Sequence, residues 1–362
     1  MSEANPPDPA APEGRAAPKL LPLPPGIVLV PGLPNREKCR PAAGSGTWQP
    51  PTPEELGKLL PRYRIECLLG RGGMGAVYKG IQPELERPVA IKLLPAEIAA
   101  DEGFVTRFKR EARTLARLRH SRIVTVHDFG HTSEGHLFFV MEYIDGSDLR
   151  SVLRGPGLTA NQALRAISQI CDALDAAHRQ GVIHRDVKPE NILITREGYV
   201  KLGDFGLARP LKEDADLLTG LQLVMGTPDY MAPEQYSGDA DHRSDIYPLG
   251  VMLYEMLTGK RPHGVFDPPS VKAKTDARLD HVVLKALQQE PERRYQRASE
   301  MKTEVDAILA TPHGTKQPPP NAAACVSERA GSGIWRGWRS KRLSRPPPPS
   351  SRCLLSAAIS GG

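Results

Sequence analysis

One short run near the middle of the chain holds an acid, a base and an amide within eight residues: His184-Arg185-Asp186-Val187-Lys188-Pro189-Glu190-Asn191. Apolar stretches enclose it, Gly181-Val182-Ile183 before and Ile192-Leu193-Ile194 after. Thirteen positions beyond Asn191 comes a second polar point, Asp204-Phe205-Gly206. Polar groups so dense between two apolar strands are improbable as filler. The run therefore predicts a functional site.

A glycine-rich stretch earlier in the chain, Gly70-Arg71-Gly72-Gly73-Met74-Gly75, is followed by Val77 and fits the pattern G-x-G-x-x-G-x-V. The same string opens dinucleotide-binding folds, where it leads from a strand into a helix. Here it lies between two strand-like runs. The tip of such a hairpin can place backbone N–H groups over phosphates. A plain glycine hairpin remains the alternative.

A lysine among apolar neighbours closes the run Val89-Ala90-Ile91-Lys92. Burying an ammonium without a partner is costly, so this lysine needs an anion. Glu111, nineteen positions later on a predicted helix, is the natural candidate. An ordinary surface lysine on a strand remains the alternative.

The elements around these motifs fall into two groups. Strand patterns dominate up to about Tyr143, with one amphipathic helix inserted from Phe104 to Arg119. Helical patterns dominate after Asp148. The predicted strands are 63–69, 76–82, 88–94, 123–129 and 136–142, and the later helices are 160–180, 244–257, 279–289 and 298–309. This order predicts an α+β fold with a small β-rich lobe before a larger helical lobe.

The two ends of the chain differ from the middle in composition. Residues 1–61 and 311–362 are rich in proline and lack apolar periodicity, so we expect disordered segments on both sides of a domain at 62–310. The last segment holds eight Lys or Arg and one acid, and therefore carries the chain's positive charge. The excess belongs to a tail, so no nucleic-acid partner is predicted.

The remaining composition points to a soluble protein of the cytoplasm. The five cysteines are scattered and odd in number, which suits a reducing compartment and argues against a disulfide framework or a zinc site. No stretch approaches the length of a membrane span, and the first residues lack the pattern of a signal peptide.

At these motifs, with Ala232-Pro233-Glu234 following, the chain resembles the eukaryotic-like serine/threonine protein kinases of bacteria. The resemblance covers about Tyr63 to Ile308. It implies the bilobal protein kinase fold, ATP as cofactor with Mg²⁺ or Mn²⁺, and protein substrates with serine or threonine acceptors.

The resemblance also assigns catalytic and metal-binding roles. Asp186 would orient the substrate hydroxyl and accept its proton, and Lys188 would lie beside the γ-phosphate. Asn191 and Asp204 would hold the metal. Lys92 would hold the α- and β-phosphates and be held by Glu111. Lys188 and the pair Gly226-Thr227 match the serine/threonine class, with the Thr227 hydroxyl reaching Asp186.

The nucleotide site implied by the resemblance has a glycine-rich roof and a hinge. Met141 resembles the gatekeeper, the backbones of Glu142 and Ile144 would pair with adenine, and Asp148 would reach the ribose hydroxyls. A plain strand end is the alternative for this stretch. The other residues expected around the nucleotide are Leu69, Gly70, Gly72, Gly73, Gly75, Val77, Ala90, Lys92 and Glu111.

Further matches predict support for the site. Leu115, Val126, His184 and Phe205 would form an apolar column between the lobes. Asp245 would accept backbone N–H groups of the run that contains Asp186, and Glu234 would pair with Arg294.

Two features depart from the family. Pro248 falls in the first turn of a predicted helix or just beyond it. In the first turn a proline is harmless, but one residue further in it would kink the helix. Residues 263–277 are too few for the helix with flanking loops that is usual in kinases, which leaves the mode of substrate docking open.

Three functions remain to be compared. The first is an active kinase, and the second is a pseudokinase scaffold that binds nucleotide or partners without transfer. In the third, the basic proline-rich tail is a functional module in its own right. The complete set of Lys92, Glu111, Asp186, Asn191 and Asp204 favours the active kinase.

Arg185, beside the predicted base, suggests regulation by an anion. We expect Thr219 to be phosphorylated in trans by a second copy through transient self-association, with the phosphate bound by Arg185. Alternatively, the acids at 213–216 would substitute for the phosphate.

Overall fold

The computed structural model describes residues 48–72, 75–205 and 228–311. The predictions for Gly73, Gly206, Thr219 and Thr227, and for the segments 1–47 and 312–362, lie outside these ranges.

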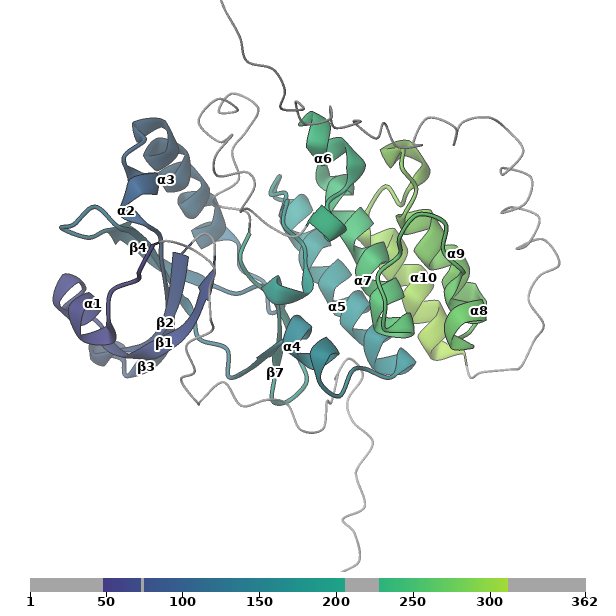
Figure 1. Ribbon diagram of the computed structural model, residues 1–362, viewed down its shortest axis with the longest axis horizontal. Coiled ribbons are helices and arrows are strands. Elements are labelled where there is room, and N and C mark those ends of the chain that lie inside the picture. Colours follow the sequence, from purple (N-terminus) through teal and green to yellow (C-terminus); the bar gives the residue numbers. More distant parts are fainter. Residues whose placement is uncertain (1–47, 73–74, 206–227, 312–362) are drawn as a thin grey trace, which may run out of the picture. The chain divides into compact units, whose positions relative to one another are not determined.

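A five-stranded antiparallel sheet in the order β1-β2-β3-β5-β4 forms the first lobe (Figure 1). Helix α3, Glu102–Arg117, starts at the cap Asp101, whose carboxylate accepts from the Gly103 N–H at 2.8 Å. It buries Phe108 and Ala112 against Leu137 and Phe139 of the sheet. The strands are β1 (Arg64–Gly72), β2 (Gly75–Gln82), β3 (Arg87–Leu93), β4 (Val126–His131) and β5 (Leu137–Glu142); the short helix α2 (Ala96–Ala99) precedes α3.

The residues just before this sheet are folded, which corrects the expectation of disorder for residues 48–61. Helix α1, Pro53–Leu59, begins with a capping box in which Thr52 and Glu55 bond reciprocally. Its Leu56 is fully buried in the same cluster as Tyr63 and Tyr78 of the lobe. Composition did not predict this helix because its stability comes from packing on the sheet. One buried leucine and one capping box are enough to stabilise a short helix where the sheet provides a surface to pack against.

The second lobe is helical around the long helix α5, Ala160–His178, whose N-terminus carries a Thr159/Gln162 capping box. A small sheet in the order β6-β7-β8 lies beside these helices. Its strands are β6 (Gly146–Asp148), β7 (Ile192–Thr195) and β8 (Val200–Leu202), and the remaining helices are α4 (Leu149–Arg154), α6 (Pro233–Ser237), α7 (Ile246–Thr258), α8 (Pro269–Ala273), α9 (Arg278–Ala286) and α10 (Ala298–Ala310). The α+β expectation is confirmed, with each predicted element present within a few residues.

Of the two departures noted in the sequence, Pro248 has a local explanation. Pro248 is the third residue of α7, so its missing N–H falls in the first turn, where no intrahelical partner exists. Helix α7 ends at Gly259, which adopts φ 70°. The short segment after it contains α8, a helix of five residues.

The cysteines differ from expectation at one position. Cys171 is free and buried in the core, and burial raises the pKa of its thiol. Cys67, on β1, is disulfide-bonded. Spacing along the sequence says little about distance in the fold, so the argument against disulfides fails for Cys67. In the part of the chain that the structure describes, no helix is long and apolar enough to cross a membrane.

Candidate active site

The loop that contains Asp186 is fastened to helix α7 through one buried carboxylate. Asp245, 1% exposed, accepts the backbone N–H of His184 at 2.8 Å and of Arg185 at 2.7 Å. The imidazole of His178 bonds the same carboxylate at 2.8 Å. The predicted role of Asp245 as an acceptor for this loop therefore matches the geometry.

His184 fixes the loop from the other side. Its Nδ1 accepts the N–H of Asp186 at 3.2 Å, so Nε2 carries the proton and donates to the Gly203 carbonyl at 2.9 Å. Burial lowers the pKa of His184, although Asp245 and the Gly203 carbonyl oppose the shift. The neutral ring thus ties the Asp186 loop to the residue before Asp204. It also lies 4.5 Å from the ring of Phe205, within the predicted apolar column.

The Asp186 carboxylate is held by its two polar neighbours in the motif. Lys188 Nζ lies 2.7 Å from Asp186 Oδ2. The amide nitrogen of Asn191 donates to the Asp186 carbonyl at 2.8 Å and to Oδ2 at 3.1 Å. Arg185, just before, adopts φ 65°, a region that non-glycine residues rarely occupy. The backbone strain and the converging bonds orient Asp186 from within its own loop.

Lys92 is paired differently from the sequence-based expectation. Its ammonium lies 3.0 Å from Asp204 Oδ1, and the described residues contain no ion pair between Lys92 and Glu111. Burial alone would raise the pKa of Asp204, but the charge and hydrogen bond of Lys92 outweigh it, so that pKa lies below its ordinary value. The two residues are near the same cavity although 112 positions separate them in the chain.

Glu111 lies on α3, where burial and several arginines act on its carboxyl. Burial raises the pKa of its carboxyl, and the positive charge of Arg185 is the largest effect that opposes this shift. Arg110 and Arg107 contribute further in the same direction. Burial prevails over these arginines, so the pKa of the Glu111 carboxyl lies above its ordinary value.

A cavity of about 140 Å³ lies between the two lobes, and most of the residues expected around a nucleotide line it. These are Leu69, Gly70, Val77, Ala90, Met141, Glu142, Ile144, Asn191 and Asp204. The sequence interpretation missed Val124, Tyr143, Glu190, Leu193 and Gly203, which also line it. Leu193 had a signal, since it alternates with the buried Ile192 and Ile194 along β7 and so faces the other way.

Some expected nucleotide residues lie outside the lining and have other contacts. A Cβ on Gly75 would fall 2.1 Å from the Leu93 carbonyl oxygen, so the glycine permits β2 to approach β3. Asp148 caps α4, accepting from the Ser151 N–H at 2.8 Å and the Ser151 hydroxyl at 2.9 Å. Gly72, Lys92 and Glu111 are not among the lining residues either.

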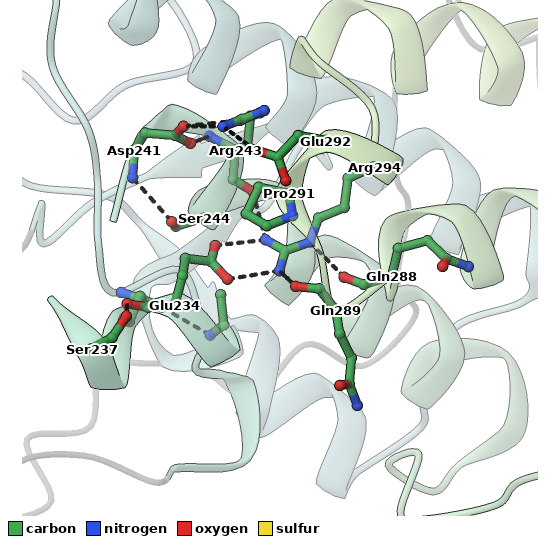
Figure 2. Close-up of polar contacts among 12 residues, drawn as sticks. Glu234, Ser237, Asp241, Arg243, Ser244, Gln288, Gln289, Pro291, Glu292 and Arg294 are labelled. Atoms are coloured by element: carbon green, nitrogen blue, oxygen red, sulfur yellow. Dashed lines mark hydrogen bonds and ion pairs between the residues drawn. The ribbon is translucent and has the colours of Figure 1, made fainter. Parts of the chain in front are cut away.

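A buried ion pair supports the loop from the helical lobe (Figure 2). Arg294, with a fully buried side chain, donates to both carboxylate oxygens of Glu234 at 2.6 and 2.7 Å. Its remaining N–H groups reach the carbonyls of Gln288 and Gln289. The predicted pair is thus present. Its neighbour Gln235 donates to the Arg185 carbonyl at 2.9 Å, which links the pair to the Asp186 loop.

Comparison with known proteins agrees with this geometry. Residues 63–315 match the protein kinase domain. The chain is 43% identical over 267 residues to the serine/threonine-protein kinase PknB of Mycobacterium tuberculosis, covering 68% of this chain and 43% of that protein. It is 39% identical over 285 residues to the serine/threonine-protein kinase pkn3 of Myxococcus xanthus, covering 72% and 52% respectively.

A solved structure gives the same result. The PknI kinase domain of M. tuberculosis superposes with a TM-score of 0.58 at 32% identity, covering 69% of this chain and 96% of that domain. The chain spans about half the length of the curated relatives, and the shared part is the kinase domain. The chain belongs to the protein kinase family, among the eukaryotic-like serine/threonine kinases of bacteria.

Proposed function

We propose that this protein transfers the γ-phosphoryl group of ATP to serine or threonine hydroxyls of protein substrates. The observation that carries the proposal is the Asp186 carboxylate, held between Lys188 at 2.7 Å and Asn191 at 3.1 Å. Asn191 also lines the cavity between the lobes. A fixed carboxylate beside a cavity for a phosphate donor is the arrangement that phosphoryl transfer requires.

The residues that line the cavity suit the adenine of ATP in their chemistry. Apolar side chains form opposite walls, with Leu69, Val77 and Ala90 from the sheet and Leu193 from β7. The hinge residues Glu142 and Ile144 offer backbone groups along one edge. We propose that adenine lies between the walls and pairs with the hinge. We propose that Asp148, which also caps α4, reaches the ribose hydroxyls.

The polar end of the cavity suits a hard divalent cation. Asp204 offers a carboxylate, and Asn191 turns its amide nitrogen toward Asp186, which directs its oxygen elsewhere. Oxygen ligands from carboxylate and amide groups are those that Mg²⁺ and Mn²⁺ prefer. We propose that Asn191 and Asp204 hold the metal. When bound, the metal and ATP supply the reactive phosphoryl group with its charge neutralised.

The chain's own residues then position the reactants. Asp186 orients the substrate hydroxyl and accepts its proton, with Lys188 beside it to stabilise the transferred group. Lys92 binds phosphate oxygens and keeps Asp204 ionised. The serine/threonine class is supported by Lys188 in the motif and by the names of the relatives.

Turnover and binding of an Asp186→Asn variant test the proposal. We expect kcat to fall by about two to four orders of magnitude, because the variant loses a proton acceptor, while ATP affinity changes little. Asp172→Asn, a half-exposed aspartate on α5, is the matched control and should retain wild-type turnover. Near wild-type turnover in Asp186→Asn would overturn the assignment. If the wild type and Asp186→Asn both bound ATP but neither transferred phosphate, the pseudokinase alternative would hold.

Regulation is a second part of the proposal, supported by Arg185 directly before Asp186 and by the pairing of Lys92 with Asp204 rather than with Glu111. We propose that a second copy phosphorylates Thr219 in trans and that the phosphate draws Arg185 to itself. Glu111 then becomes available to Lys92. Mass spectrometry of the purified protein and the rate of a Thr219→Ala variant test this step. An unmodified Thr219 together with full activity of the variant would favour the acids at 213–216 as a permanent substitute for the phosphate.

A further inference from the structure

A second cavity, of about 580 Å³, lies beside the end of α7 and the short segment that contains α8. Four basic side chains line it: Lys260, Arg261, His263 and Lys272. Its two acids are Glu255 and Asp267. The cavity is open here because the segment after α7 folds only the five residues of α8.

A single arginine connects this cavity to the nucleotide cavity. Arg150 donates from Nε to Glu190 at 2.9 Å and from Nη1 to Glu255 at 2.8 Å. Glu190 lines the nucleotide cavity, and Glu255 lines the second cavity. Glu190 also lies four positions after Asp186 in the same loop. A peptide whose hydroxyl reaches Asp186 therefore passes within a few residues of the second cavity, at about 3.3–3.6 Å per extended residue.

The bonds of Arg150 weaken the acidic attraction that Glu190 and Glu255 would otherwise exert on a substrate. Its guanidinium also contacts the Tyr230 hydroxyl, and Tyr230 donates to Glu255. Burial would lower the pKa of Arg150, but its hydrogen bonds to Glu190, Glu255 and Tyr230 outweigh burial and raise it. Arg150 is thus charged, and it offsets one of the two negative charges while its N–H groups occupy an oxygen of each glutamate.

The basic side chains of the second cavity are not neutralised to the same degree. Arg261 pairs with Asp229 and lies 6.0 Å from the centre of the Tyr230 ring. Among residues 48–72, 75–205 and 228–311, no ion pair involves Lys260, His263 or Lys272. Lys260 and Lys272 are exposed to solvent, and Asp267 is the exposed acid among the described residues that line the cavity. The mouth of the cavity therefore carries a net positive charge.

We propose that the second cavity binds acidic side chains of the protein substrate, so that the enzyme selects serines and threonines with aspartate or glutamate nearby. This inference rests on the proposed kinase activity and names its substrate class. Lys260 and Lys272 attract the carboxylate by charge complementarity, while Arg150 denies a basic substrate residue its acidic partners. The exposed Val265 and Val271, 86% and 66% exposed, add apolar surface close to the lysines in sequence.

Peptides with one threonine in a neutral background test this proposal. Aspartate, glutamine or arginine is placed at each flanking position in turn, and kcat/KM is measured for the wild type and for the double variant Lys260→Glu/Lys272→Glu. At one or more positions we expect aspartate peptides to exceed glutamine peptides by about tenfold, mainly through KM. The double variant should lose this preference and favour arginine at the same positions.

The glutamine peptides separate failure of the inference from failure of the kinase proposal. Both proteins should phosphorylate the glutamine peptides at similar rates. Lys58→Glu/Lys109→Glu, two exposed lysines elsewhere, is the matched control and should retain the wild-type preference. Equal rates for aspartate and glutamine peptides at every position would overturn the inference while the kinase activity stands. A double variant that keeps the preference for aspartate would also overturn it. No transfer to any peptide or to the protein itself would contradict the kinase proposal instead.

Discussion

The loop around Asp186 and the helix α3 around Glu111 contribute to one site but are held in different ways. The loop is bonded to the buried Asp245 through two backbone N–H groups, to Gln235 through a carbonyl, and internally through Lys188 and Asn191. Glu111 lies on a helix packed by apolar contacts of Phe108 and Ala112. Its partner expected from the sequence, Lys92, pairs with Asp204.

The difference shows which half of the site is fixed by the fold. Hydrogen bonds have narrow ranges of distance and angle, so the bonds to the buried carboxylate of Asp245 fix the position of the loop backbone. Apolar packing of α3 allows displacement along or around the helix at a smaller cost, because such contacts are not directional. We infer that the helical lobe presents Asp186 ready for use, and that the position of Glu111 is the adjustable part.

The largest expected effect comes from breaking the fixed half. Asp245→Asn replaces a carboxylate that accepts from His184, Arg185 and His178, and we expect kcat to fall by about 100-fold or more. Near-ultraviolet circular dichroism would check that the fold remains. His178→Gln, which loses one of the three contacts, should have a much smaller effect. Equal losses in both variants would show that the backbone bonds are not what positions the loop.

The next prediction addresses the adjustable half. Lys92→Met should reduce kcat/KM by about 100-fold or more, because phosphate oxygens and Asp204 both lose their cation. Glu111→Gln in protein without phosphate on Thr219 should change the rate by less than about threefold. The same substitution in phosphorylated protein should reduce it substantially. A large loss of rate from Glu111→Gln in unmodified protein would mean that Glu111 already pairs with Lys92 before phosphorylation.

The helix before the matched family region gives a stability prediction. Leu56 is fully buried against the sheet, so Leu56→Ala should lower the free energy of unfolding by about 2–4 kcal/mol. Leu85→Ala, at a position 59% exposed, should change it by less than about 0.5 kcal/mol. Chemical denaturation of both variants measures the difference. Equal free energies of unfolding for the two variants would show that α1 does not stabilise the domain, which would then begin at residue 62.

A smaller effect concerns the pH dependence of Glu111. Burial raises the pKa of this carboxyl above its ordinary value of 4.5, so the folded protein binds its proton more tightly than the unfolded chain. The stability contribution of this group is therefore present below pH 4.5 and is lost as the pH rises through the raised pKa. Glu111→Gln should stabilise the protein slightly at pH 7, and the gain should shrink as the pH falls. A loss of stability at pH 7 would show that the carboxylate has a stabilising partner.

Sequence reasoning anticipated the geometry best where the candidate residues lie in one short run. Asp186, Lys188 and Asn191 lie within six residues, so one loop determines their mutual geometry. Asp245 and Glu234 were also anticipated, from their places in the family's motifs. The apolar cavity residues Val124 and Leu193 were missed, because apolar residues in strands look alike whether they face a core or a ligand.

Other features depend on distances that the sequence does not contain. The pairing of Lys92 with Asp204 joins residues from two lobes. Folding of α1 depends on a sheet formed by later residues, and the bonds of Arg150 join Glu190 and Glu255, which are 65 positions apart. The second cavity is likewise formed by side chains of α7 and of the segment after it, whose arrangement the sequence does not contain.

Transfer of labelled phosphate from ATP is the most direct test of the central claim. The protein is incubated with γ-labelled ATP, Mg²⁺ and a threonine- and serine-containing substrate, and the labelled amino acids are identified after hydrolysis. We predict phosphothreonine and phosphoserine with wild-type protein, no phosphotyrosine, and loss of the label with Asp186→Asn. Label that persists undiminished in Asp186→Asn, or none above background in the wild type, would contradict the assignment of Asp186 as the base of a serine/threonine kinase.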